Sequence, residues 1–403
     1  MSGEASPASA PAGLQPAGAF ARLFTPQRLI MSVFFLHAVG LSNFWPRVPD
    51  LQSRLAVGPG ELSIAMLGMP LATVFAVPFA GSLIAKFGAR RMLTLALPLT
   101  TLSIALPGWS FDVATLFAAL FLIGLTYPVV DIAMNVEADR IERTGGRRIM
   151  STCHGCWSVG SVTGGLVATA FAGAGVSPGW HLVIVALAIL PLAFSIPQAL
   201  PELDGGVRAG RVALALPSRG IIGLCFFLFG TLMVEVTARN WGAVFVTDVL
   251  EAPAVYAGLT YSAFALAMAV ARFAGDRLVD RFGPVAVARV SCLIALVGLA
   301  LVVFAGSPIQ VVIGFAAAGL GVATGFPLSA TAAAGRGDLP PAVNVAALQV
   351  IGVGAFLFTP PLIGGIAELA GLRVGIAVVL PMILASLLLA GELRRKAASP
   401  PGG

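Results

Sequence analysis

The feature that most limits the fold of this chain is a series of apolar runs, each about 20 residues long, separated by short polar breaks. An α-helix of that length crosses a hydrocarbon layer of about 30 Å. Only 10% of the 403 residues are charged, and the mean hydropathy is +0.95. So few charges cannot cover the surface of a soluble protein of this size. The twelve runs therefore predict an all-α membrane protein with twelve transmembrane helices.

The runs also predict where the helices and their connections lie. We expect the first four helices at about 28–48, 61–80, 92–108 and 113–137, and the next two between about 150 and 200. We expect the last six at about 219–245, 254–275, 285–305, 309–333, 342–367 and 373–391. The predicted organisation is a disordered cytoplasmic tail (1–27), a six-helix half (28–200), a cytoplasmic linker (201–218), a second six-helix half (219–391) and a second cytoplasmic tail (392–403). The first tail lacks the apolar core of a signal peptide.

A short basic stretch shows that the chain is duplicated. Gly81-Ser-Leu-Ile-Ala-Lys-Phe-Gly-Ala-Arg-Arg91 returns in the second half as Gly275-Asp-Arg-Leu-Val-Asp-Arg-Phe-Gly283. Each copy lies between two long apolar runs, where a glycine allows a tight turn. Two six-helix halves related by an axis along the membrane normal form a substrate site between them, near the midplane.

These stretches resemble the loop between the second and third helices of major facilitator transporters. The resemblance rests on Gly81, Gly88, Arg90 and Arg91 in the first copy and on Asp280, Arg281 and Gly283 in the second. Ala85 replaces the aspartate of the pattern in the first copy. The resemblance implies the major facilitator fold of two pseudo-symmetric halves and alternating access by rocking of these halves around a central cavity.

The basic residues predict the orientation in the membrane. If the N-terminus is cytoplasmic, all 24 lysine and arginine residues, Arg272 included, lie on the cytoplasmic side, except Arg47, Arg54, Arg239 and Arg373. Membrane proteins concentrate these residues in cytoplasmic loops, so we expect both termini in the cytoplasm. The excess of arginine over lysine and the family resemblance predict a bacterial inner membrane. Because the loops account for the net charge of +6, no nucleic-acid partner is expected.

Two helices carry ionisable groups that are costly in lipid and should therefore face protein or water. In the fourth, Asp131 and Asn135 share one face, and in the fifth His154 and Ser158 do so. Asp131 and His154 should lie at similar depth, where they can touch. We interpret both as proton-coupling groups; the alternative for Asp131 is a structural hydrogen bond to a neighbouring helix. In the fifth helix, Gly160 and Gly164 predict a face that packs against another helix.

The Asp131–Asn135 pattern is similar to the fourth helix of fucose-permease-like transporters, whose acid takes part in proton coupling. The acidic residue that those proteins carry in the first helix has no counterpart in Ser42-Asn43-Phe44-Trp45. The wider resemblance is to a bacterial branch of major facilitator proteins, mostly of unassigned substrate. It implies a transporter and leaves the substrate open.

A second set of polar residues lies toward the opposite membrane surface. Glu235 and Arg239 are spaced for an ion pair on one helical face. We expect Glu235, Arg239, Asn240 and Trp241, together with Trp45 and Arg47, to form either the substrate cavity and its gate or an interfacial anchor. Asn43, Asn135 and Ser158 complete the residues that we expect in the cavity or its gate.

The sequence predicts a monomeric secondary transporter rather than an enzyme. No nucleotide-binding pattern, nucleophile–base set or metal-ligand set is seen, and Cys153 and Cys156 lie alone in an apolar helix. No cofactor or metal is expected; the expected partners are a small-molecule substrate, a proton or other coupling ion, and the lipid bilayer. Our first hypothesis is proton symport of a small polar organic solute, a sugar-like one among the candidates. The alternatives are proton-antiport export of amphipathic compounds and a non-transporting membrane sensor or scaffold.

Overall fold

The computed structural model describes residues 25–146, 148–202, 217–336 and 339–394. The described elements are helical, and twelve spans are long and apolar enough to cross a membrane. The predicted fold class is therefore confirmed. Most of the predicted linker and of both predicted tails lies outside the described residues.

The first half contains eight α-helices, of which α2 with α3, and α4 with α5, each make up one span. They are α2 (Pro26–Ser42), α3 (Val48–Leu55), α4 (Pro59–Met66), α5 (Gly68–Phe87), α6 (Ala89–Ser103), α7 (Val113–Gly145), α8 (Met150–Gly173) and α9 (Pro178–Ala199), with short helices η1 (Trp45–Arg47) and η2 (Pro107–Trp109).

The second half repeats this arrangement, and here α13 with α14, and α16 with α17, each make up one span. Its helices are α10 (Ile222–Val244), α11 (Val255–Phe282), α12 (Pro284–Val303), α13 (Pro308–Val322), α14 (Gly325–Ala334), α15 (Pro341–Ala370), α16 (Leu372–Ala377) and α17 (Val379–Leu389), with short helices η3 (Arg219–Ile221), η4 (Phe245–Val249) and η5 (Ala390–Leu393).

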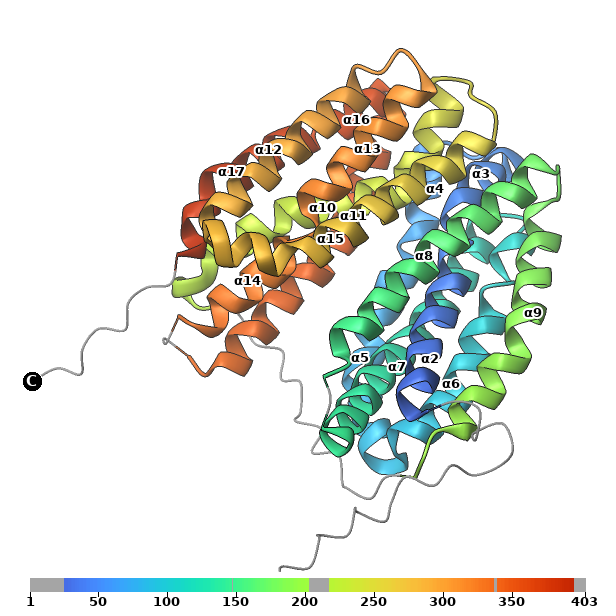
Figure 1. Cartoon of the computed structure of the whole chain (residues 1–403). Coiled ribbons are helices and arrows are strands. Elements are labelled where there is room, and N and C mark those ends of the chain that lie inside the picture. The colour runs from blue at the N-terminus through green and yellow to red at the C-terminus, as the bar shows by residue number, and fades with distance from the viewer. Residues whose placement is uncertain (1–24, 147, 203–216, 337–338, 395–403) are drawn as a thin grey trace, which may run out of the picture.

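The two halves lie side by side, the first in blue to green and the second in yellow to red (Figure 1). We call the end that carries the turns at Gly88 and Gly283 the basic end, and the end that carries the connection between α3 and α4 the far end. The ribbons of the two halves approach each other near α3 and α4 and diverge toward α14 and the basic end (Figure 1).

The turns at the basic end explain why several helices are longer than predicted. Gly88 and Gly283 have φ angles of +86° and +81°, which only glycine adopts at little cost, and each ends a helix there. Gly81 and Gly275 instead lie inside helices α5 and α11. The predicted ends at 80 and 275 were therefore too early. The predicted end at 137 was also too early, because α7 continues to Gly145 and ends before Gly146, whose φ is +64°. Polar side chains at a helix end reach water while the backbone hydrogen bonds continue, so a change in composition does not mark the last turn.

Small residues bring α8 against α2; the sequence predicted this packing face without indicating which helix it contacts. A Cβ atom added at Gly160 would lie 2.5 Å from the backbone oxygen of Phe35, and one at Gly164 would lie 2.6 Å from that of Val39. The two backbones therefore touch without side chains between them. This packing sets the position of Trp157 and Ser158, one turn before Gly160.

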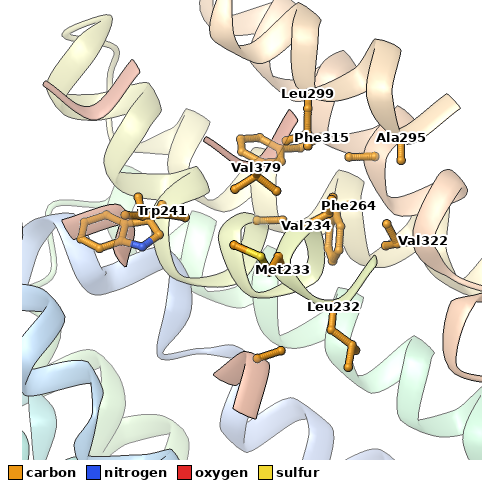
Figure 2. Close-up of a cluster of buried hydrophobic side chains, with 14 of the residues drawn as sticks. Leu232, Met233, Val234, Trp241, Phe264, Ala295, Leu299, Phe315, Val322 and Val379 are labelled. Carbon is orange, nitrogen blue, oxygen red and sulfur yellow. The ribbon is translucent and has the colours of Figure 1, made fainter. Parts of the chain in front are cut away.

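Large apolar side chains cover the outside of the bundle. Phe79, Phe111 and Leu369 are among the many that are exposed, as is expected of a surface that contacts lipid rather than water. Inside the second half, α10 is surrounded by apolar side chains of its neighbours, among them Phe264 of α11 and Phe315 of α13 (Figure 2).

Candidate functional site

A cavity of about 320 Å³ lies between the two halves. Its size is at the lower end of the range of small-molecule sites. Both halves contribute to its wall: Leu41, Ser42, Trp45, Met66, Met69, Pro70, Thr73, Leu120, Tyr127, Trp157 and Ser161 come from the first half, and Leu232, Arg239, Asn240, Tyr261, Phe326, Gln349, Gly352, Val353 and Phe356 from the second. Most of these side chains are apolar or aromatic, so the few polar groups decide how a solute is oriented.

A smaller pocket of about 20 Å³ shares part of this wall, including Trp157, Arg239 and Tyr261. It brings the guanidinium groups of Arg239 and Arg272 next to the hydroxyl-bearing residues Ser158 and Ser161. We call it the side pocket. It is the most cationic part of the cavity region.

Glu235 and Arg239 form the ion pair for which their spacing allowed. The Arg239 Nη2 donates to Glu235 Oε1 at 2.6 Å, and the Glu235 side chain is the more buried of the two. Arg239 and Asn240 line the main cavity, as does Trp45 of η1. Arg239 thus belongs to the cavity wall, Glu235 holds it from behind, and the pair does not bridge the two halves.

Asp131 is half-buried in α7, one turn after Tyr127 of the cavity wall. Its carboxylate makes no hydrogen bond or ion pair with any residue that the structure describes. Asn135 donates only to the backbone oxygen of Asp131, at 2.8 Å. Asp131 and His154 do not pair: the His154 ring lies edge-on against Phe34, with 5.4 Å between ring centroids.

An aromatic cluster at the cavity wall connects α2, α7 and α8. His37 is buried and stacks on Tyr127, with 5.5 Å between ring centroids, and it packs at 5.1 Å against Trp157. Tyr127 lies close enough to Asp131, Glu235 and Arg239 to feel their charges. Tyr127 is therefore a wall residue that is close to the acid of the first half and to the ion pair of the second.

Asn43 and Arg47 do not line the cavity, contrary to our expectation. Asn43 Nδ2 donates to the backbone oxygen of Val39, so its Oδ1 accepts from His181 Nε2 at 2.8 Å. His181 Nδ1 then accepts from Arg47 Nη1 at 3.4 Å, and Arg47 Nε pairs with Asp50 at 2.6 Å. These four residues, Asn43, Arg47, Asp50 and His181, form the far-end polar cluster. It lies inside the first half, because the side chains of Asn43 and Arg47, on either side of Trp45, extend toward His181 in α9.

Trp241 does not line either pocket, and neither do Asn135 and Glu235, which we had also assigned to the cavity or its gate. Trp241 is the most deeply buried of the three. Its side chain is fully buried in an apolar core that contains residues of both halves (Figure 2), and it does not line the cavity. It follows Asn240 by about 100° around the helix. Residues that are adjacent in one helix therefore face different surroundings. Tryptophan is both apolar and able to form a hydrogen bond, so its presence does not indicate whether it faces a core or a cavity.

The structure adds a role for Arg272 that the sequence did not indicate. We had counted it only among the residues of the cytoplasmic side, and it lies ten residues before the end of α11 and lines the side pocket. Tyr127, Trp157 and Tyr261 are further wall residues that sequence reasoning missed, since aromatic residues in apolar helices carry no signal of which face they occupy.

The residues of the two basic stretches lie away from the cavity. Arg90 pairs with Glu202 and donates to the backbone oxygen of Gln198, which joins α6 to the end of α9. The Arg281 guanidinium lies 5.2 Å from the ring centroid of Phe282. These contacts support the basic end of each half.

Contacts between the halves close the far side of the cavity. Tyr261 of α11 donates to Ser42 of α2 at 2.9 Å. Glu368 of α15 accepts from the backbone nitrogen of Gly60 at the start of α4, at 3.1 Å. A Cβ atom added at Gly364 would lie 2.5 Å from that of Ser63. The two halves are therefore in tight contact at this end.

Comparison with known proteins agrees with this arrangement. The sequence profile described as "Major Facilitator Superfamily" matches residues 30–209 and 215–402. An uncharacterized transporter of Sinorhizobium fredii, y4wD, is 32% identical over 379 residues, which is 91% of this chain and 99% of the relative. An uncharacterized MFS-type transporter of Yersinia pestis is 28% identical and covers 87% of this chain and 91% of its own length.

Solved structures show the same fold. A mutant of the nucleoside transporter NupG superposes with a TM-score of 0.74 at 14% identity, covering 92% of this chain and 99% of that one. A bacterial homolog of the human lysosomal transporter Spinster, in an inward-facing and occupied conformation, gives a TM-score of 0.68 at 13% identity. The superposition covers 93% of this chain and 98% of that one. The protein is a multi-pass membrane protein with the fold of these transporters, and the chain belongs to the major facilitator superfamily.

Proposed function

We propose that the protein is a secondary active transporter that moves a small organic solute through the central cavity by alternating access, coupled to protons. The observation that carries the proposal is a cavity of about 320 Å³ whose wall comes from both halves. A solute in it would contact both halves at once, so rocking of one half against the other would move the solute from one end to the other.

Asp131 is the proton carrier in this proposal. Its carboxylate is inside the bundle and makes no hydrogen bond or ion pair with the described part of the chain. A carboxylate held this way can take up and release a proton without breaking an internal contact. Tyr127, one turn away, belongs to the cavity wall and would carry the effect of that charge to the solute. Symport is the direction of coupling that we favour.

Export of amphipathic compounds by proton antiport is the second candidate. It is favoured by the many apolar and aromatic side chains of the wall, such as Met66, Trp157, Phe326 and Phe356. We further propose that the protein works as a monomer in a bacterial inner membrane, with the basic end and both termini in the cytoplasm, because this end carries most of the cations.

The test is proton movement in proteoliposomes, followed with a pH-sensitive dye during addition of sugars, organic acids and cationic amphiphiles. We expect one solute class to move protons, and Asp131→Asn to reduce this flux at least about 100-fold while exchange of solute for solute continues. Asp139→Asn is the matched control, because Asp139 lies on the same helix but pairs with Arg143 near the basic end. Coupled flux that persists in Asp131→Asn would refute the role of Asp131, and flux of protons against the solute would establish antiport.

A further inference from the structure

Arg272 of α11 lines the side pocket, and its side chain is exposed there. It lies ten residues before α11 ends, which is about 15 Å along the helix. Within residues 25–146, 148–202, 217–336 and 339–394, it makes no hydrogen bond or ion pair.

Other arginines at depth in the bundle are satisfied by the protein itself. Arg47 binds Asp50, His181 and a backbone oxygen, and Arg239 binds Glu235. Arg373 donates to two backbone oxygens near the far end. A charge in a membrane-spanning helix costs free energy unless it is paired or hydrated. Arg272 is therefore placed for an external partner rather than for folding.

The charges around the side pocket leave a positive balance. Glu235 neutralises Arg239, and Arg272 is close enough to both to feel their charges. Among the described residues, no carboxylate lines the side pocket itself, and Glu235 reaches it only through its pair with Arg239. Ser158 and Ser161 add hydroxyl groups to the same wall. Two guanidinium groups, two hydroxyls and one compensating carboxylate make a site for a single negative charge.

The two pockets differ in size, so each can hold a different part of one solute. The side pocket, about 20 Å³, has room for one small group, since a single water needs roughly 10–15 Å³. The main cavity, about 320 Å³, is mostly apolar and shares Trp157, Ser161, Arg239 and Tyr261 with the side pocket. A solute can thus place a charged group in one and its body in the other.

We propose that the solute is an organic acid whose carboxylate is bound by Arg272 in the side pocket. This inference rests on the proposed transport function and names its substrate class. The planar guanidinium can donate two parallel hydrogen bonds to a carboxylate, and the aromatic and apolar wall receives the carbon skeleton. A neutral or cationic solute of the same shape would leave Arg272 unpaired or would be repelled by it.

The test compares acids with their own amides, which differ in charge and hardly in shape. Three pairs of compounds are titrated into the purified protein, and binding is measured as a rise in its melting temperature. The pairs are glucuronate and glucuronamide, hexanoate and hexanamide, and 4-hydroxybenzoate and 4-hydroxybenzamide. We expect at least one acid to stabilise the protein, with an apparent Kd about 10- to 100-fold lower than that of its amide. The comparison needs only the wild-type protein and therefore holds whether or not a variant folds.

The variants assign the effect to the side pocket. Arg272→Gln should abolish the preference for the acid, and Arg272→Lys should retain part of it because the charge remains. Arg277→Gln, which changes an exposed arginine nearer the end of the same helix, should leave the preference unchanged. Equal binding of acid and amide to wild type, stabilisation by amides only, or no stabilisation by any acid would each overturn the inference.

Flux measurements separate this inference from the proposed function. Proton-coupled flux of an amide or sugar without flux of an acid would leave the transport function standing and overturn the organic-acid class. Binding of acids that requires Arg272, without movement of any solute into proteoliposomes, would support the anion site and refute transport.

Discussion

The far-end polar cluster and the charges around the cavity use similar side chains in opposite ways. In the cluster, Asn43, Arg47, Asp50 and His181 bond one another within one half. Around the cavity, between the halves, Asp131 and Arg272 make no hydrogen bond or ion pair in the described chain. Satisfied polar groups hold a fold together, whereas unsatisfied charges in an accessible cavity are available to a proton or a solute.

The sharpest way to break this comparison is to make the same substitution in both regions. Arg47→Gln removes the charge of a side chain that is 2% exposed and leaves Asp50 and His181 without their partner. We expect a loss of about 2–4 kcal/mol in the free energy of unfolding. Arg272→Gln removes a charge without internal partners, so we expect a change below about 1 kcal/mol.

Unfolding of the purified protein by heat and by denaturant measures both variants. If Arg272→Gln costs as much stability as Arg47→Gln, Arg272 is a structural residue and the distinction between the two regions is wrong.

A smaller effect is expected from the two asparagines that we had assigned to the cavity. Asn43→Ala leaves the buried Nε2 of His181 without its acceptor, which should cost about 1–3 kcal/mol. Asn135→Ala removes only a bond to a backbone oxygen of its own helix and should cost less than about 0.5 kcal/mol. The same unfolding measurements check the pair, and equal losses would show that Asn135 has a structural partner in another conformation.

The smallest effect concerns the contact that closes the far end. Glu368→Ala removes an exposed hydrogen bond to Gly60, which should weaken closure by about 0.5–1 kcal/mol, a two- to fivefold change in the open population. The labelling rate of Ser63→Cys by a membrane-impermeant thiol reagent reports this opening, in a background whose four native cysteines are replaced by alanine.

Glu251→Ala is the matched control, because Glu251 is exposed in the far-end connection after η4. A labelling rate that changes equally in both variants would mean that surface charge, and not the contact with Gly60, controls opening.

The features of the site that the sequence predicted correctly are those that depend on spacing within one helix. The Glu235–Arg239 pair followed from a spacing of four residues, since one helix places such residues on one face. The packing face at Gly160 followed in the same way from the spacing of small residues within one helix, but its partner α2 did not. Asn43 and Arg47 were misplaced because their partner His181 lies more than 130 residues away. Nothing local indicates such a contact.

The sequence by itself determined the class of protein, its twelve spans and its division into two related halves. These properties depend on the length and polarity of local runs and on their repetition, and water and lipid enforce them directly. Only the tertiary structure decided that Trp241 is core, that Arg47 is satisfied, and that Arg272 lies beside Arg239 in a pocket shared by both halves. Each of these outcomes depends on how helices rotate and cross, and those angles arise from the fit of many distant side chains at once.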